Sequence, residues 1–232
     1  PNTGTTYFWY NGVNKITKTY HNGNYIYYYY DHLHRLTKKD LPSGETDVTY
    51  TYDQTGYANG KGRLTTRVDD GGTWRYSYDS MGRVKTRKLT TEGANYTMTF
   101  GYDFSGKISN IMFPNGYDAD FTYTNAGNLS KVYLNGSTVA TYTSYNAEGK
   151  PGRVTYGNGV YTDYQYKTMG QLSSLITKKS STVLQNNSYT FDNVGQVTKI
   201  TDNRSSKYVS GINTDVTQTF TYDSLDRLTR AV

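Results

Sequence analysis

The sequence contains no cysteine, which excludes disulfides, cysteine-based metal sites and thiol nucleophiles. Alanine and glutamate are scarce, with 7 and 3 residues, and leucine, isoleucine and valine together supply only 33 of 232. Because alanine and glutamate favour helices, their scarcity argues against a helical bundle, a coiled coil or an ordinary α/β enzyme. The longest apolar run, Tyr25 to Tyr30, is far too short to cross a bilayer.

The sequence also lacks any block of like charge. Its net charge is +6, but lysine and arginine are interspersed with aspartate and threonine along the whole chain. A nucleic-acid-binding protein normally carries a dense basic patch, so we expect no nucleic-acid partner. The short apolar runs lead us to expect no membrane insertion either.

What the sequence has in excess is tyrosine (27 residues), threonine (36) and glycine (23). Tyrosine and threonine favour strands, and the tyrosines belong to a repeat of the form Tyr-Asp-x-x-Gly-Arg-Leu. We expect residues 1–232 to form a single array of ten such repeats with no separate domain. The lead aromatic residues of the ten repeats are Tyr10, Tyr30, Tyr52, Tyr78, Tyr102, Tyr123, Tyr145, Tyr166, Phe191 and Tyr222.

Two further columns define the strands. Six positions after the lead aromatic, or slightly later where residues are inserted, all ten repeats carry leucine, isoleucine or valine, for example Leu36 and Val84. A second aromatic precedes most lead aromatics by two positions, a period-two alternation that predicts a strand with two different faces. We expect these pairs to form a structural aromatic ladder between neighbouring strands. The ladder comprises Tyr28, Tyr30, Tyr50, Tyr52, Tyr76, Tyr78, Phe100, Tyr102, Phe121, Tyr123, Tyr164, Tyr166, Tyr189, Phe191, Phe220 and Tyr222.

A turn column lies four positions after the lead aromatic. It holds glycine in seven repeats, and the three exceptions are Asn14, His34 and Asp226, residue types that tolerate positive φ. The seven glycines are Gly56, Gly82, Gly106, Gly127, Gly149, Gly170 and Gly195. We expect a left-handed position that closes a tight turn, so valine at Gly82 or Gly106 should destabilise the chain and asparagine at Gly82 should be better tolerated.

The residue directly after the lead aromatic is aspartate in six repeats and asparagine in two. Its side chain can accept hydrogen bonds from backbone N–H groups two residues on, as in an Asx-turn. The six structural-turn aspartates are Asp31, Asp53, Asp79, Asp103, Asp192 and Asp223, and Thr124 and Lys167 depart from the pattern.

A second turn is expected seven residues before several lead tyrosines, at Gly23, Gly71, Gly116 and Gly159. Each repeat is then two strands and two turns. Ten repeats predict an all-β fold of roughly twenty antiparallel strands in one long β-strip, which must coil because sheets twist.

The phased Tyr-Asp-x-x-Gly-Arg-Leu motif resembles the YD-repeat or Rhs (rearrangement hot spot) family, over essentially the whole chain. This family includes Rhs proteins, the B and C components of Tc toxins, wall-associated proteins and teneurins. The resemblance implies a strip that spirals into a hollow shell or tube wall, which encloses a toxic C-terminal polypeptide in toxin members and is an adhesion scaffold in teneurins. The sequence contains no Asp-Pro, so the self-cleaving site of toxin members is absent from it.

No residue set predicts catalysis, cofactor binding or a metal site. A repeated aspartate is structural first, and the His32-x-His34 pair is better explained by the turn column than by metal ligation. Exposed tyrosines could stack on sugar rings, which keeps glycan binding open as an alternative.

The leading hypothesis is a non-enzymatic wall segment of a large secreted or cell-surface protein. Because Pro1-Asn2 resembles an inter-repeat turn, we expect the strip to continue past both ends as a fibre or tube. Its partners would be further repeats of the same chain or head-to-tail copies of itself. The alternatives are a wall segment of a toxin-enclosing cocoon and a glycan-binding or adhesion module.

Overall fold

A computed structural model describes residues 4–204, 208–209, 212–213 and 217–232. The turn expected at Pro1-Asn2 lies outside these residues. The described residues form 22 β-strands and contain no helix, so no helix in them could span a membrane. Twenty of these strands are assigned to one antiparallel sheet, and β19 pairs with β20 separately. The all-β class and the antiparallel strip predicted from the repeat are confirmed.

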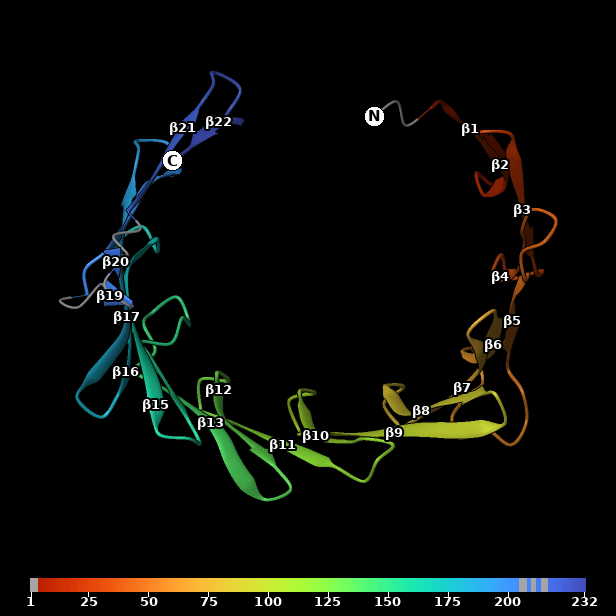
Figure 1. Cartoon of the computed structure of the whole chain (residues 1–232). Coiled ribbons are helices and arrows are strands. Elements are labelled where there is room, and N and C mark those ends of the chain that lie inside the picture. Colours follow the sequence, from red (N-terminus) through yellow and green to blue (C-terminus); the bar gives the residue numbers. More distant parts are fainter. Residues whose placement is uncertain (1–3, 205–207, 210–211, 214–216) are drawn as a thin grey trace. The chain divides into compact units, whose positions relative to one another are not determined.

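The chain divides into two compact units, and the first comprises residues 1–117 with the first five lead aromatics. Its strands follow one another as antiparallel neighbours in sequence order (Figure 1). They are β1 (Thr6–Tyr10), β2 (Ile16–His21), β3 (Asn24–Tyr30), β4 (Leu36–Asp40), β5 (Val48–Tyr52), β6 (Leu64–Asp69), β7 (Gly72–Tyr78), β8 (Val84–Thr91), β9 (Ala94–Tyr102) and β10 (Ile108–Met112).

The second compact unit, residues 118–232, contains the other five lead aromatics. It repeats the same antiparallel order, except that β18 pairs with β21 across the short β19–β20 hairpin. Its strands are β11 (Asp118–Tyr123), β12 (Leu129–Leu134), β13 (Ser137–Thr143), β14 (Arg153–Tyr156), β15 (Val160–Tyr166), β16 (Leu172–Lys179), β17 (Thr182–Phe191), β18 (Val197–Asp202), β19 (Tyr208–Val209), β20 (Ile212–Asn213), β21 (Gln218–Tyr222) and β22 (Leu228–Ala231).

The second turn of each repeat is often a two-residue hairpin loop. Between β2 and β3 the loop is Asn22–Gly23, both at positive φ (47° and 86°), and His21 pairs with Asn24 across it. Two positive φ values give a turn whose twist matches the right-handed twist of the strands. The loop before β7 differs, because there Gly72 rather than Gly71 has the positive φ, of 122°. A Cβ on Gly72 would lie 2.4 Å from the Thr90 carbonyl oxygen.

Nine of the ten lead aromatics lie at a β-bulge, and Tyr145, which follows the end of β13, is the exception. Tyr30 pairs with Leu36 while its neighbour Tyr29 pairs with Lys38, so Thr37 is the extra residue. The same shift occurs where Tyr10, Tyr52, Tyr78, Tyr102, Tyr123, Tyr166, Phe191 and Tyr222 pair with their aliphatic partners. A bulge increases local twist and redirects the strand, so it leads the chain into the tight turn that follows.

The strip is one sheet thick, and very few side chains are buried. Among the described residues the buried apolar side chains are Tyr78, Ala119, Ala140 and Val154, and the buried polar ones are Thr19, Thr65, Thr162 and Asp202. A central core therefore contributes little to stability. Each repeat depends instead on contacts with its neighbours, as in other repeat proteins.

Candidate functional site

The site that recurs along the chain is the tight turn after each lead aromatic. All ten residues of the turn column have positive φ, including the non-glycine residues Asn14 (59°), His34 (59°) and Asp226 (60°). Except in the repeat with inserted residues before Arg63, the residue after the lead aromatic and the residue four later close the turn. In the second repeat, for example, the Asp31 N–H donates to the Arg35 carbonyl and the His34 N–H donates to the Asp31 carbonyl, each at 3.0 Å.

The side chain of the turn aspartate accepts hydrogen bonds from backbone N–H groups of its own turn. Asp31 Oδ1 accepts hydrogen bonds from the backbone N–H groups of Leu33 and Arg35, each at 2.9 Å. Asp79 and Asp223 make the same two bonds in their own turns. The bond two residues on is the one the Asx-turn predicts, and the structure adds a second bond four residues on. Asn11 and Asn146 bind both N–H groups in the same way, so the geometry requires an acceptor oxygen rather than a charge.

The two repeats that have Thr124 and Lys167 in place of the turn aspartate form the same turn. Thr124 uses its hydroxyl to accept from the Asn128 N–H at 3.1 Å. At Lys167 the backbone alone closes the turn, because Gly170 N–H donates to the Lys167 carbonyl at 2.8 Å. The side chain therefore strengthens a turn that the backbone conformation already defines.

The basic residue after the turn column joins one repeat to the next. Arg35 Nε bonds Asp31 of its own turn at 2.7 Å, and Arg35 Nη2 bonds Asp53 of the next turn at 2.7 Å. Its guanidinium also lies over the ring of Tyr52, 4.3 Å from the centroid. Arg83 repeats this arrangement with Asp79 (2.7 Å) and with the ring of Tyr102 (4.3 Å). Hydrogen bonds from the Arg35 guanidinium and from the Gly62 N–H hold the pKa of Asp53 below its usual range.

The hydroxyl of the lead tyrosine is the second link between repeats, and sequence reasoning missed it. Tyr30 donates to the carbonyl of Ile16, the aliphatic-column residue of the preceding repeat, at 2.8 Å. Tyr52, Tyr78, Tyr102, Tyr145 and Tyr222 donate to the column residues Leu36, Leu64, Val84, Leu129 and Val197 in the same way, and Tyr166 donates to Pro151. Burial raises the pKa of Tyr78, which keeps its hydroxyl protonated and able to donate. The signal in the sequence was the choice of tyrosine rather than phenylalanine in nine of ten repeats.

The lead aromatics are therefore joined to their neighbours by hydroxyl groups and cations, rather than by the ring-to-ring ladder expected from the sequence. Lead residues of successive repeats are two strands, or roughly 10 Å, apart, and aromatic pairs need centroids within about 7 Å. Cations cover several of the lead aromatic rings, such as Lys150 over Tyr166 and Lys167 over Phe191. Direct ring contacts occur instead among Tyr7, Trp9, Tyr20, Tyr25 and Tyr27, which we call the aromatic patch.

The aromatic patch lies on the sheet face opposite to the lead aromatics. In eight repeats the residue just before the lead aromatic, on that opposite face, is glycine, serine, threonine or glutamine, as at Thr51 and Ser77. In the first two repeats it is Trp9 and Tyr29, which are 40% and 48% exposed. Lys18 lies among the rings, 4.2 Å from the Trp9 centroid and close to Tyr25 and Tyr27.

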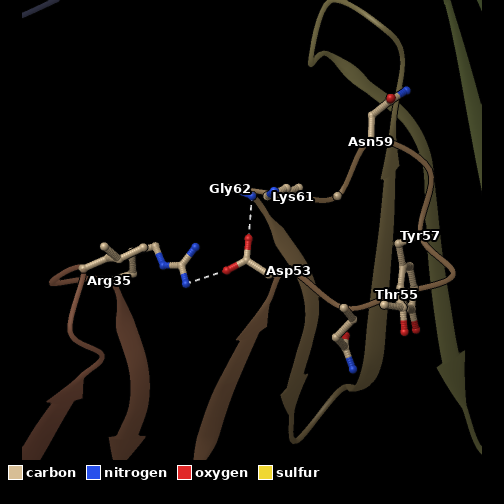
Figure 2. Close-up of a pocket in the computed structure, with 10 residues that line it drawn as sticks. Arg35, Asp53, Thr55, Tyr57, Asn59, Lys61 and Gly62 are labelled. Atoms are coloured by element: carbon tan, nitrogen blue, oxygen red, sulfur yellow. Dashed lines mark hydrogen bonds and ion pairs between the residues drawn. The ribbon is translucent and has the colours of Figure 1, made fainter.

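The six-residue insertion before Arg63 widens the third turn into a cavity of about 670 Å³. Figure 2 shows Asp53 at its centre, bonded on one side by Arg35 and on the other by the N–H of Gly62. The inserted loop also binds the next repeat, because Asn59 Nδ2 donates to the Tyr78 carbonyl at 3.0 Å and Tyr78 N–H donates to the Ala58 carbonyl at 2.9 Å. Arg35 and Asp53, which line the cavity, are thus engaged in the junction between repeats.

The remaining candidate for chemistry was the pair His32 and His34. His34 occupies the left-handed turn position, as the turn column predicts. Within the described residues no three histidine, aspartate or glutamate side chains lie together as a possible metal site.

Comparison with known proteins shows where this architecture recurs. The Teneurin YD-shell family model matches residues 43–190. The structure of the Photorhabdus luminescens Tc holotoxin pore matches with a TM-score of 0.84 and 21% identity, over 99% of this chain and 13% of that one. TcdB2-TccC3 without its hypervariable C-terminal region matches with a TM-score of 0.85 and 22% identity, over the same shares. No match was found among curated proteins.

An antiparallel strip of repeated tyrosine-bearing turns defines the chain as a YD-repeat shell protein. Because the family model covers more than half of the chain, the chain belongs to the Teneurin YD-shell family. The predicted family is confirmed, and the Tc toxin structures show the same fold. The chain spans about one eighth of the solved chains it matches.

The turn column should require a left-handed residue. We expect Gly106→Val to destabilise the protein by about 1–3 kcal/mol, because a β-branched residue is strained at φ 85°. Gly106→Asn should cost clearly less, since asparagine tolerates this region. Gly106 is a cleaner test than Gly82, where any Cβ would lie 2.1 Å from Arg63 Nη2. Thermal melts of the two variants decide the matter, and equal losses would contradict it.

The tyrosine hydroxyl should carry part of the coupling between repeats. Tyr78→Phe should lower the free energy of unfolding by about 1–3 kcal/mol, because the Leu64 carbonyl loses its donor in a buried site. Tyr76→Phe is the matched control on the same strand, since the Tyr76 hydroxyl makes no hydrogen bond within the described residues. Denaturant unfolding measures both, and similar losses would show that ring packing alone matters.

The turn aspartates should make stability acid-sensitive. Hydrogen bonds from backbone N–H groups and from the following arginine lower the pKa of Asp31 and Asp223 in the fold. A lowered folded pKa gives stability that is present above the unfolded value, about 4, and is lost as the pH falls through the folded value. The melting temperature of the Asp31→Asn, Asp223→Asn variant should therefore fall less steeply below pH 4 than that of the wild type. Parallel curves for the two proteins would refute this assignment.

Proposed function

We propose that this chain is a non-enzymatic wall segment of a larger secreted or cell-surface YD-repeat protein. The observation that carries the proposal is that the aspartates, arginines and tyrosines of the repeat hydrogen-bond within the turns and between neighbouring repeats. The turn aspartates bind backbone N–H groups and arginines, Arg35 also binds the next turn, and the tyrosine hydroxyls bind carbonyls of the preceding repeat. These groups hold the sheet together and form no arrangement suited to catalysis.

The partners proposed for the segment are further repeats, either in the same chain or in head-to-tail copies. Support comes from the relatives, whose solved chains are several times longer than this sequence and share its fold over 99% of it. A junction built only from neighbouring repeats can be extended by adding repeats, and the proposed product is a fibre or tube. The alternative product is a closed cocoon around a toxin.

Electron microscopy of the native material tests the wall. Long filaments or tubes with an axial repeat are expected. Discrete closed particles would favour the cocoon instead, and a small monodisperse monomer would contradict both forms of wall.

A second candidate function, glycan binding, is favoured by the aromatic patch. Four of its five side chains are exposed and Tyr20 is half-buried. Tyrosine and tryptophan present an apolar ring beside a polar group that can meet a sugar hydroxyl. No other pair of adjacent repeats replaces the small polar residues of this face by two large aromatics.

A glycan-array screen of the folded protein tests this second function. Saturable binding should weaken in Trp9→Ala and persist in Tyr96→Ala, a comparably exposed aromatic (47%) outside the patch. Absence of binding to any glycan would remove glycan binding and leave the wall function untouched.

A further inference from the structure

Three tyrosines stand in a row across the first three strands. Tyr7 of β1 pairs directly with Tyr20 of β2, and Tyr20 pairs directly with Tyr25 of β3. The ring centroids of Tyr20 and Tyr25 are 4.7 Å apart with an interplanar angle of 46°, and those of Tyr7 and Tyr20 are 6.1 Å apart. Tyr20 and Tyr25 thus form the tighter pair.

The hairpin loop holds this pair in register. Asn22 and Gly23 form the two-residue loop, and His21 pairs with Asn24 immediately above the tyrosines. Directly opposite residues on antiparallel strands have Cβ atoms roughly 5 Å apart, which brings two phenol rings into contact. The contact therefore follows from strand register and does not depend on a chance side-chain orientation.

The equivalent position in comparable hairpins carries no tyrosine pair. In the β6–β7, β8–β9, β12–β13 and β16–β17 hairpins the opposite residues are Val68 with Thr73, Thr90 with Asn95, Tyr133 with Thr138, and Lys178 with Val183. The Tyr20–Tyr25 pair thus departs from these hairpins. It lies on the same sheet face as Trp9 and Tyr29, where the other repeats have small or polar residues.

Tyr25 is open to small reagents, Tyr20 is half-buried, and both lie close to other oxidisable rings. Tyr25 is 42% exposed. Trp9 and Tyr27 lie 6.3 Å and 6.2 Å from Tyr25, centroid to centroid. A radical formed on either of these rings, or on Tyr7, is one short transfer from the pair.

We propose that Tyr20 and Tyr25 form a site of oxidative cross-linking, with hydrogen peroxide as the oxidant and a haem peroxidase as the catalyst. Each phenol loses one electron and one proton to give a tyrosyl radical. The two radicals couple through a carbon–carbon bond between ring carbons ortho to the hydroxyls. The proton on each coupling carbon then moves to its phenolic oxygen and restores the aromatic rings. Overall the pair loses two hydrogen atoms, and one hydrogen peroxide is reduced to two molecules of water.

Such a link suits a sheet with no cysteine and almost no core. The β2–β3 hairpin is held by strand pairing and surface contacts. The chain has no cysteine, so no disulfide can reinforce the hairpin. A carbon–carbon bond between the strands cannot be reduced, so the hairpin would stay closed in conditions that separate hydrogen-bonded strands.

The test treats the purified full chain with horseradish peroxidase and limiting hydrogen peroxide, followed by dityrosine fluorescence and mass spectrometry. The tryptic peptide 19–35 contains both residues. We expect this peptide to lose the mass of two hydrogens and to give no fragment ions between Tyr20 and Tyr25. The same treatment in urea should spread the product over many tyrosine pairs.

Two variants make the assignment specific. Tyr25→Phe should abolish the linked peptide 19–35, while Tyr27→Phe, which removes another exposed patch hydroxyl, should retain it. Circular dichroism establishes that both variants fold. A dominant Tyr7–Tyr20 link, an equal spread over many pairs in the folded protein, or an undiminished product in Tyr25→Phe would each overturn the proposal.

Discussion

A wall that is one sheet thick has no interior to hold it together, so the structure depends on the junction between successive repeats. At that junction the lead tyrosine donates its hydroxyl to a carbonyl of the preceding repeat, and cations such as Arg35 and Arg83 cover the ring of the next lead tyrosine. Each bond alone contributes about 1 kcal/mol, but the same bonds recur along the chain and cooperate through a rigid turn. Stability is then a sum of neighbour terms rather than a property of one core.

This junction explains why the repeat has its particular residues. The aspartate orders the turn, glycine or another left-handed residue closes it, and the arginine bonds the aspartate while covering the next tyrosine ring. The turn glycine has a second role in some repeats, because a Cβ at Gly170 would lie 2.3 Å from Glu148 Oε2 of the preceding turn. Backbone freedom and close approach therefore both favour glycine in this column.

Periodicity made most of this fold predictable. Strand alternation and two turn signals per repeat led directly to the antiparallel strip, and the exceptions Asn14, His34 and Asp226 already indicated positive φ. The links between repeats were harder to predict, because a column of tyrosines shows that a ring is required but not where its hydroxyl points. The β-bulge was equally hidden, although a serine or threonine column at positions such as Thr37, Ser109 and Thr198 marks its extra residue.

The aromatic patch illustrates what a repeat protein can reveal about itself. Each position has up to nine internal equivalents in the same fold, so a residue that departs from its column is under a requirement that the wall does not impose. Trp9 and Tyr29 depart from a polar column, and Tyr20 opposes Tyr25 where the β6–β7, β8–β9, β12–β13 and β16–β17 hairpins carry at most one tyrosine. Exposed aromatic surface carries a cost in solubility. The first two repeats are therefore where a function beyond the wall is best sought, and the short Tyr20–Tyr25 contact is its most specific chemical feature.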